Sequence, residues 1–585
     1  MARWSLAVVA ILLGVALLRA VGLDYGAPYW LESDAYTALH VDELRSGRGS
    51  NPKTANDTHY PHLIAQLTRR LPAAEPPDPA NFDDPAELRA AHLAAAGRTF
   101  VQVRLIVALL SLLAIPGTWW LARRFLEPPW ALFAVGLCAT SLLFQCFGQQ
   151  ARPHAAAAAL MLLSVLASMR LARRPSAANF LLAGVCAALA FGCLHSGVAV
   201  LIPLSAAYFV RRLPAGTSRA RRAFDPLALL PLTCVALVVP VFYPFLLSPQ
   251  QMSLNEGIDV GKHAVDFTHH RVAFDAFDGS GFATVLRTLW TWEPALGLLV
   301  ALACLVWLAT RGRRVPESPD RCRDRRVVLA FCVPYLLVIG AYAETYERFL
   351  LPLVPFLAVF AACGPARLWA APSWRWWLAT AAVGALAVSG FAAGRLAWLR
   401  TRPDTLARAG AWIEAHAEPG VDPVFVFPPP MDLPLGRDAA SIGVRGDRPT
   451  PLFSVWSRYQ ARRPGAGGPA PQWSVRWIVG KPEVRKSTDP ERVSSFLDEY
   501  GPGIYVMQVM TGRGPAFATL LRAELARRAE RAGGEVVRFG PDPDPWSCDY
   551  PLFDQDELVE HWPNVFARIL RARALGPVVE VLRVR

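Results

Sequence analysis

Eleven long apolar runs constrain the fold of this chain more than any other feature. A helix needs about 20 apolar residues to cross the hydrocarbon core of a bilayer. The 585 residues are 53% hydrophobic and only 18% charged, a composition typical of membrane helices rather than a water-soluble core. We predict a polytopic α-helical membrane protein with spans at residues 5–23, 102–121, 130–147, 154–171, 178–194, 197–211, 226–247, 287–309, 327–343, 349–369 and 376–398.

The first of these runs has two interpretations. Arg3 precedes an apolar stretch of the length found in signal peptides, so this segment could be cleaved. No small-x-small cleavage site follows it cleanly, and we therefore favour a signal anchor that stays in the membrane.

The basic residues indicate how the spans are oriented. The formal net charge is +13, yet most arginines lie in short loops between apolar runs. With the N-terminus in the cytoplasm, these loops all fall on the cytoplasmic side, as the positive-inside rule requires. The charge therefore marks topology and predicts no nucleic-acid partner. The loops 24–100 and 248–285, and everything after about 399, then lie on the outer face. The Arg- and Ala-rich composition favours the inner (plasma) membrane of a bacterium.

The ten cysteines predict neither a disulfide framework nor a zinc site. Eight of them fall inside apolar runs, where a thiol behaves as a small hydrophobic group. Only Cys322 and Cys548 lie in polar stretches, and neither has a partner at the spacing of a metal site or a CxxC motif.

The sequence pattern changes after residue 398. FATLLRAELARRAERAG has the apolar spacing of an amphipathic helix. Strands are expected at 424–427, 473–480, 503–510 and 577–585. We therefore predict a membrane-embedded catalytic bundle over 1–398, with a structured outer loop at 24–100, and an extracytoplasmic α/β domain over 399–585.

Acidic residues follow the first apolar run, at the start of the outer loop. The stretch LESDAYTALH carries Glu32 and Asp34 close to the exit of the span. Isolated carboxylates there could simply be solvated, because charge outside the hydrocarbon costs little. The loop continues through His-Tyr-Pro into an amphipathic segment, which predicts an ordered structure. Since long ordered loops commonly carry function, Glu32 and Asp34 are candidate catalytic carboxylates.

Cationic residues precede two of the later spans. In FGQQARPHAAAAALMLL, Arg152 and His154 open a helix, whose free N–H groups can bind an anion together with the guanidinium. The alternative is that Arg152 only extends to the membrane interface. In ETYERFLLPLVPFLAVFAA, Arg348 stands before a proline-containing helix, and its alternative role is a surface pair with a neighbouring glutamate.

The outer loop at 261–271, GKHAVDFTHHR, gathers cationic and imidazole side chains. Its histidines could bind a metal, but their spacing on a loop is weak support for such a site. Contact with phosphate or solvent is favoured, and Lys262 and Arg271 are the candidate phosphate-binding groups.

Acidic and cationic groups on one face of a membrane bundle suit a reaction in which a lipid-borne phosphate leaves. A carboxylate can take the proton of an attacking hydroxyl group. Cations can stabilise the charge that develops on the phosphate as the glycosidic bond breaks.

The order of these elements resembles the GT-C glycosyltransferases, in particular the bacterial relatives of dolichyl-phosphate-mannose protein mannosyltransferases and of lipid A aminoarabinose transferases. The resemblance covers about residues 1–430 and the terminal PVVEVLRV. It is carried by SDAYTALHVDELRSGRGSNPKTANDTHYPHL, GQQARPHAAAAALMLLSVLASMRLARR, ERFLLPLVPFLAVFAA and RPDTLARAGAWIEAHAEPG. It implies transfer of a hexosyl or pentosyl group, with inversion, from a polyprenyl-phosphate donor to a hydroxyl of a glycan, lipid or protein.

The resemblance also implies roles for single residues. Asp34 matches the general base of the first loop, and Glu32 is the neighbouring alternative. Arg152 and His154 match an Arg-Pro-Asp-like element in which a histidine replaces the usual acid, and this favours phosphate contact there. Some members bind a divalent metal and others do not. The other residues expected near the donor are Arg348 in an Arg-Tyr-Leu-Leu-Pro-like element, His59 and Tyr60 in the first loop, and His195 after the fifth span.

Two other functional classes stay open. A transporter is also polytopic, but transporters place broken helices and polar residues near the bilayer midplane and often contain repeats, which this sequence does not indicate. A non-catalytic scaffold of envelope biogenesis would use the outer domain to bind a partner. Only the enzyme would require Asp34 for activity.

Overall fold

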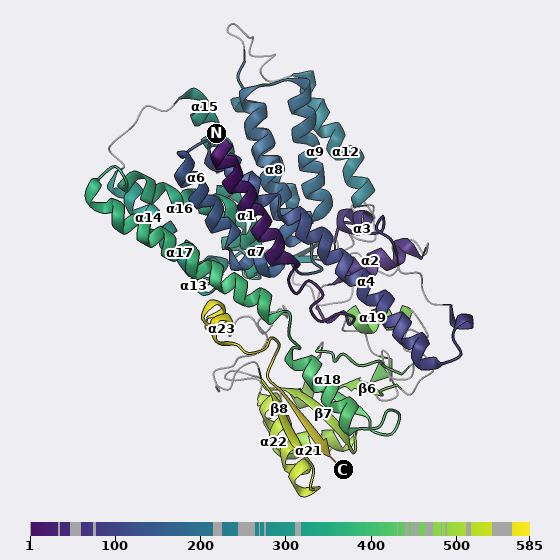
Figure 1. Cartoon of the computed structure of the whole chain (residues 1–585). Coiled ribbons are helices and arrows are strands. Elements are labelled where there is room, and N and C mark those ends of the chain that lie inside the picture. Colours follow the sequence, from purple (N-terminus) through teal and green to yellow (C-terminus); the bar gives the residue numbers. More distant parts are fainter. Residues whose placement is uncertain are drawn as a thin grey trace. The chain divides into compact units, whose positions relative to one another are not determined.

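The chain forms two compact units, each built from three segments (Figure 1). The helical unit contains Met1–Val21, Tyr36–Leu71 and Val103–Ala397, and the sheet unit contains Gly22–Ala35, Pro72–Gln102 and Trp398–Arg585. The computed structural model describes residues 2–32, 35–46, 60–73, 78–213, 225–243, 264–267, 270–273, 276–310, 318–429, 431–438, 444–445, 448–449, 455–462, 472–480, 482–485, 488–509, 516–540 and 564–584.

Helices occupy all eleven segments in which spans are predicted. Within the described residues, four helical stretches are long and apolar enough to cross a membrane, or five if one bent pair counts as a single span. The chain is thus mostly helical with several apolar helices, and the number of eleven spans stays a prediction. The helices that lie wholly or largely in the helical unit are α1 (Ala2–Ala20), α2 (Tyr36–Arg45), α3 (Leu63–Thr68), α5 (Ala114–Ala122), α6 (Pro128–Ala139), α7 (Leu142–Phe147), α8 (His154–Arg173), α9 (Ala177–Cys193), η3 (His195–Val200), α10 (Leu201–Val210), η4 (Pro226–Ala228), α12 (Leu229–Phe242), α13 (Gly281–Thr291), α14 (Pro294–Ala309), α15 (Pro319–Ala341), η7 (Glu347–Leu353), α16 (Val354–Leu368) and α17 (Pro372–Leu399).

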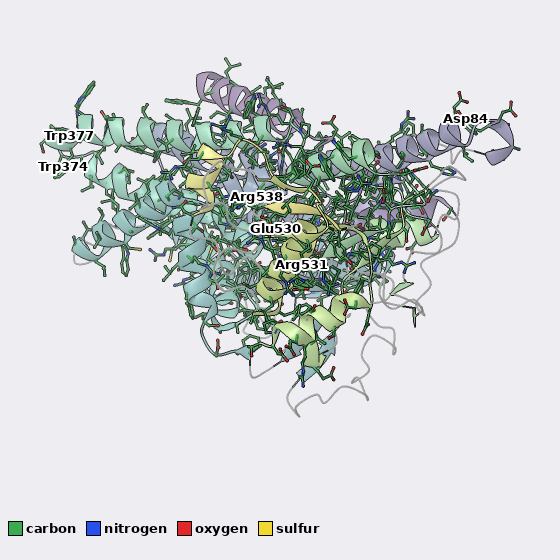
Figure 2. The ribbon with its side chains drawn as sticks, turned by 90° about the horizontal axis from the view of Figure 1, so that it is seen from below. Asp84, Trp374, Trp377, Glu530, Arg531 and Arg538 are labelled. Carbon is green, nitrogen blue, oxygen red and sulfur yellow. The ribbon has the colours of Figure 1, made fainter. Side chains whose placement is uncertain are left out.

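Helix α8 lies inside the helical unit, and α17 lies at its surface. The first turns of α8 consist of alanines, which are all buried, because small side chains let neighbouring helices approach closely. Helices α5, α9, α10 and α15 pack against α8. Helix α17 instead exposes large apolar side chains, and Trp376 is 78% exposed. Two further tryptophans of its first turns, Trp374 and Trp377, are labelled in Figure 2. Such a surface is stable against hydrocarbon and unfavourable in water.

A five-stranded mixed sheet organises the sheet unit, in the order β6-β3-β7-β9-β8. Strand β3 pairs in parallel with β6 and β7, whereas β9 pairs antiparallel with β7 and β8. Strands β3, β6, β7 and β9 lie within the four segments in which the sequence predicts strands. The bounds of the strands are β3 (Val424–Phe427), β6 (Val475–Trp477), β7 (Gly503–Gln508), β8 (Val536–Phe539) and β9 (Val579–Val584).

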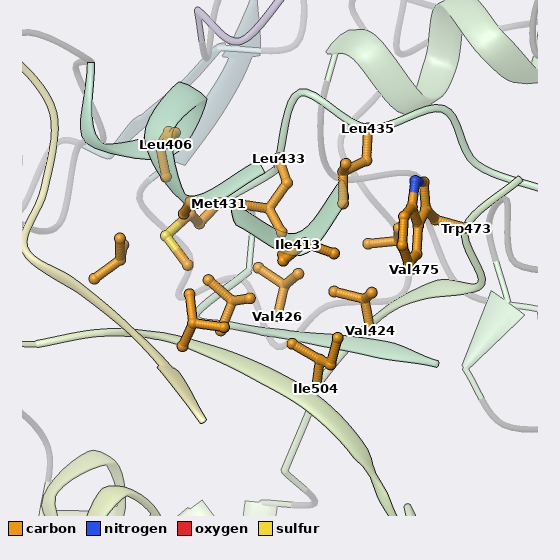
Figure 3. Close-up of a cluster of buried hydrophobic side chains, with 14 of the residues drawn as sticks. Leu406, Ile413, Val424, Val426, Met431, Leu433, Leu435, Trp473, Val475 and Ile504 are labelled. Atoms are coloured by element: carbon orange, nitrogen blue, oxygen red, sulfur yellow. The ribbon is translucent and has the colours of Figure 1, made fainter. Parts of the chain in front are cut away.

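Alternation along β3 gives the sheet a hydrophobic core on each face. Val424 and Val426 point into the first core, where Leu406 and Ile413 of α18 (Thr405–His416) cover them (Figure 3). Phe425 and Phe427 point into the second core, against α21 (Pro490–Asp498) and α22 (Ala516–Arg531). Successive side chains of a strand face opposite ways, so an uninterrupted apolar strand such as VFVF requires cover on both faces.

The remaining elements are one long helix and several short helices and strands. Helix α4 (Pro85–Ser111) runs from the sheet unit into the helical unit. The sheet unit also contains η2 (Pro79–Asn81), β4 (Val444–Arg445), β5 (Arg448–Pro449), α19 (Val455–Arg462), α20 (Pro482–Arg485) and α23 (Val565–Arg571), and the helical unit contains the hairpin of β1 (Ala264–Phe267) and β2 (His270–Ala273).

The substitution Leu521→Ala should destabilise the sheet unit. Leu521 of α22 is fully buried in the second core, and a large-to-small change in such a core costs about 2–5 kcal/mol of the free energy of unfolding. Hydrogen exchange of the β7 and β9 amides in the full chain measures this loss. Thr519→Ala, at an exposed position of the same helix, is the matched control and should change the free energy by less than about 0.5 kcal/mol. Equal protection of these amides in both variants would contradict a stabilising role of Leu521 in the second core.

Candidate functional site

The start of α8 combines a buried arginine with a helix N-terminus. Arg152 is only 1% exposed, which does not fit the alternative of a side chain that extends to the membrane interface. His154 is the first residue of α8 and is also buried. The free N–H groups of the first turn carry partial positive charge, and the guanidinium adds a full one. This end of α8 is therefore suited to a phosphate.

The end of the first loop contributes aromatic and imidazole rings to the same place. Tyr60 meets His154 edge to face, with ring centroids 5.7 Å apart. Two residues further on, His62 packs against His40 of α2, with ring centroids 4.5 Å apart. The N–H of His62 donates to the carbonyl of Phe242 at the end of α12, which fixes the path of this segment. The loop end is therefore folded against the bundle.

His62 is held in its neutral form. Burial lowers the pKa of its imidazole to about 4, because a charged ring would lose its hydration there. At pH 7 His62 therefore carries no charge, and it can accept one hydrogen bond and donate another. The sequence analysis did not select His40 or His62. The available signal in the sequence was that these two histidines stand before and after His59.

Arg348 lies in η7, which packs against both α7 and α8. Its side chain is largely buried, and its guanidinium carbon stands 4.3 Å from the centroid of the Tyr346 ring. A cation over an aromatic face is stabilised by the ring quadrupole without losing its charge. The alternative role as an exposed pair with a neighbouring glutamate does not fit this burial. Arg152 and Arg348 thus belong to neighbouring elements of one unit.

A break between α13 and α14 brings a carboxyl group into the helical unit. The two helices meet at 115°, and Glu293 lies buried between them. Its Oε1 accepts from the Ser141 hydroxyl (2.6 Å) and from the Leu143 N–H (2.9 Å) at the start of α7. The sequence analysis identified no broken helix, and this finding corrects it. The available signal was Glu293 followed by Pro294 inside an apolar run.

The other predicted residues lie in several different elements or outside the described residues. Glu32 is buried, but it belongs to the sheet unit. His195 begins η3, a partly buried turn that packs against α8 and α9. Arg271 lies in β2, where its backbone pairs with Asp266. The predicted base Asp34 lies outside the described residues, as do His59 and Lys262.

The described part of the helical unit contains two buried arginines and a helix N-terminus, groups that attract an anion. No group of three His, Cys, Asp or Glu side chains that could hold a metal ion occurs among the described residues.

Comparison with solved structures finds partial likenesses at low sequence identity. ArnT from Cupriavidus metallidurans has a TM-score of 0.44 at 16% identity, with 87% of this chain and 93% of that chain covered. The Archaeoglobus fulgidus oligosaccharyltransferase has a TM-score of 0.42 at 12% identity, covering 86% and 69%. The arabinofuranosyltransferase AftD from Mycobacteria has a TM-score of 0.42 at 16% identity, covering 100% and 40%.

No curated protein matches the chain. Residues 88–247 match the model of the family described as dolichyl-phosphate-mannose-protein mannosyltransferase. The matched segment contains Arg152, His154 and His195, the candidate residues of α8 and η3. Over these residues the match agrees with the predicted resemblance to relatives of the dolichyl-phosphate-mannose protein mannosyltransferases.

Proposed function

We propose that the chain is a GT-C-type glycosyltransferase of the bacterial inner membrane, with its N-terminus in the cytoplasm. It moves a hexosyl or pentosyl group from a polyprenyl-phosphate donor to an acceptor hydroxyl on a glycan, lipid or protein at the outer face. The domain after residue 398 lies on that face and contacts the acceptor. The carrying observation is that both arginines are buried, and that Arg348 lies in η7, which packs against α7 and α8, the two helices that flank Arg152 in the chain.

The reaction is a single displacement. The Asp34 carboxylate takes the proton of the acceptor hydroxyl, and Glu32 is the alternative base. The acceptor oxygen bonds to the anomeric carbon as the bond from that carbon to the phosphate oxygen breaks, which inverts the configuration. The polyprenyl phosphate then leaves with one additional negative charge. Arg152, Arg348 and the N–H groups of α8 stabilise that charge.

Other residues around the donor support the same assignment. Tyr60 and His154 form one side of the phosphate site, since their rings are in contact next to Arg152. His59, His195, Lys262 and Arg271 are proposed as further donor contacts from the surrounding loops. A guanidinium binds phosphate through two N–H groups in a fixed geometry, so the arginines orient the leaving group as well as neutralise it.

One observation favours a second candidate, a transporter. The break between α13 and α14 places the polar Glu293 within a pair of apolar helices, as broken helices of transporters do. A transporter would move the lipid-linked sugar without breaking its bond. A scaffold that only binds a partner would not break that bond either. Release of free lipid phosphate therefore separates the enzyme from both alternatives.

Replacing the base should abolish turnover and leave the fold unchanged. The purified full chain in nanodiscs is given a panel of radiolabelled polyprenyl-phosphate sugars with candidate acceptors, and free lipid phosphate is measured. Loss of a general base lowers the rate by about 10²–10⁴-fold, so Asp34→Asn should release almost none. Asp83→Asn, at an exposed position of the same loop, is the matched control and should match the unmodified chain. Full turnover by Asp34→Asn would refute this assignment.

Arg152→Ala and Arg348→Ala should each raise the donor KM. A hydrogen bond to a charged group contributes about 1.5–3 kcal/mol, so the KM should rise about tenfold to a hundredfold. Initial rates measured against donor concentration give the value. The acceptor KM should stay the same, because these residues contact the donor. Arg98→Ala removes an exposed arginine of the sheet unit and should leave the donor KM unchanged. An unaltered donor KM in both site variants would rule out phosphate binding by these arginines.

A further inference from the structure

Hydrogen bonds of Glu293 connect the break between α13 and α14 to the break between α6 and α7. Its carboxyl oxygen receives the Ser141 hydroxyl and the Leu143 N–H, which lie 152 and 150 residues away in sequence. Both donors stand at the start of α7, where the chain turns after α6. An interrupted helix leaves main-chain N–H groups without partners, and an apolar surrounding offers no water to replace them. Glu293 therefore supplies a hydrogen-bond acceptor for the Leu143 N–H at the start of α7.

Ring contacts continue from this junction to the start of α8. Trp292, the neighbour of Glu293, lies 6.3 Å from Phe147 between ring centroids. Phe147, the last residue of α7, lies 6.3 Å from His154. Arg152 stands between Phe147 and His154 in the chain. A continuous line of contacts thus runs from the break between α13 and α14 to the phosphate site.

Hydrogen bonds of Gln149 hold the chain just after the C-terminal end of α7. The side-chain amide of Gln149 donates to the carbonyls of Arg19 (2.9 Å) and Val21 (2.6 Å) at the end of α1. All six residues of α7 are buried. With Gln149 at one end and Glu293 at the other, the segment that leads into Arg152 is held at two points. Loss of either tether would let that segment shift.

We propose that Glu293 is a positioning residue that fixes α7, and through it Arg152 and His154, for binding the donor phosphate. The inference rests on the proposed function, since it assigns the phosphate to the start of α8. Glu293 does not itself touch the donor. Its role is that of an acceptor of hydrogen bonds, so the shape and acceptor capacity of the side chain are what the site requires.

Binding of undecaprenyl phosphate to the full chain in nanodiscs tests the role without requiring turnover. Glu293→Leu removes the acceptor and should weaken binding on the order of tenfold, as expected when a bound group is misplaced by a fraction of an ångström. Glu293→Gln keeps an oxygen that can accept both hydrogen bonds and should bind nearly as the unmodified chain does. Glu344→Leu, an exposed glutamate of the same unit, is the matched control and should bind normally.

A merely structural role would lower the amount of folded protein and leave the affinity of the folded fraction unchanged. The decisive measurement is therefore Glu293→Leu in an Arg152→Ala background, where positioning predicts a smaller loss of affinity than Glu293→Leu causes in the unmodified chain. Should Glu293→Leu fail to fold, Ser141→Ala replaces it, since that change removes one of the two donors and should weaken binding less. Normal affinity of Glu293→Leu, or losses that add in the double variant, would overturn the inference.

The outcomes for Glu293 and for the proposed function are separable. If Glu293→Leu binds normally while the unmodified chain turns over donor, only the positioning role is wrong. If Glu293→Leu weakens binding while no sugar donor is ever cleaved, the positioning role stands and the transferase function is wrong. If the unmodified chain does not bind the lipid phosphate, both are wrong.

Discussion

The helical unit depends on satisfying the main chain wherever a helix is interrupted. In apolar surroundings an unpaired N–H or C=O costs several kcal/mol, so breaks are tolerated only beside a polar side chain. Ser141 and Glu293 accept from main-chain N–H groups at the start of α7, and the Gln149 amide donates to a carbonyl at the end of α1. These interruptions give the bundle its polar interior.

Apolar periodicity predicts where helices lie but not where they break. The eleven predicted segments all contain helices, and four of the five strands of the main sheet lie in the predicted segments, whereas β8 was not predicted. The break at Glu293 falls inside one apolar run, since hydropathy averaged over a span hides a single charge. The partition of residues 22–35 and 72–102 into the sheet unit was also beyond prediction, because it depends on contacts distant in sequence.

The candidate site was predicted in part. Arg152, His154 and Arg348 were selected because each opens a helix, and the structure buries all three in one unit. Tyr60 was selected by resemblance and meets His154. His62 and Glu293 were missed because their partners, His40 and Ser141, come from other helices. Pairings between helices follow from packing angles and loop paths, which no local pattern encodes.

The position of β9 has a consequence for the order in which the chain matures. β9 lies between β7 and β8, yet it follows every other strand and helix of the sheet unit in sequence. Until the ribosome has made residues 579–584, β7 and β8 cannot be joined, and both keep an open edge. The pairing of β7 and β8 with β9 therefore forms after the other strands of the sheet unit have been synthesised. Until then the unpaired strand edges can mispair with strands of other chains.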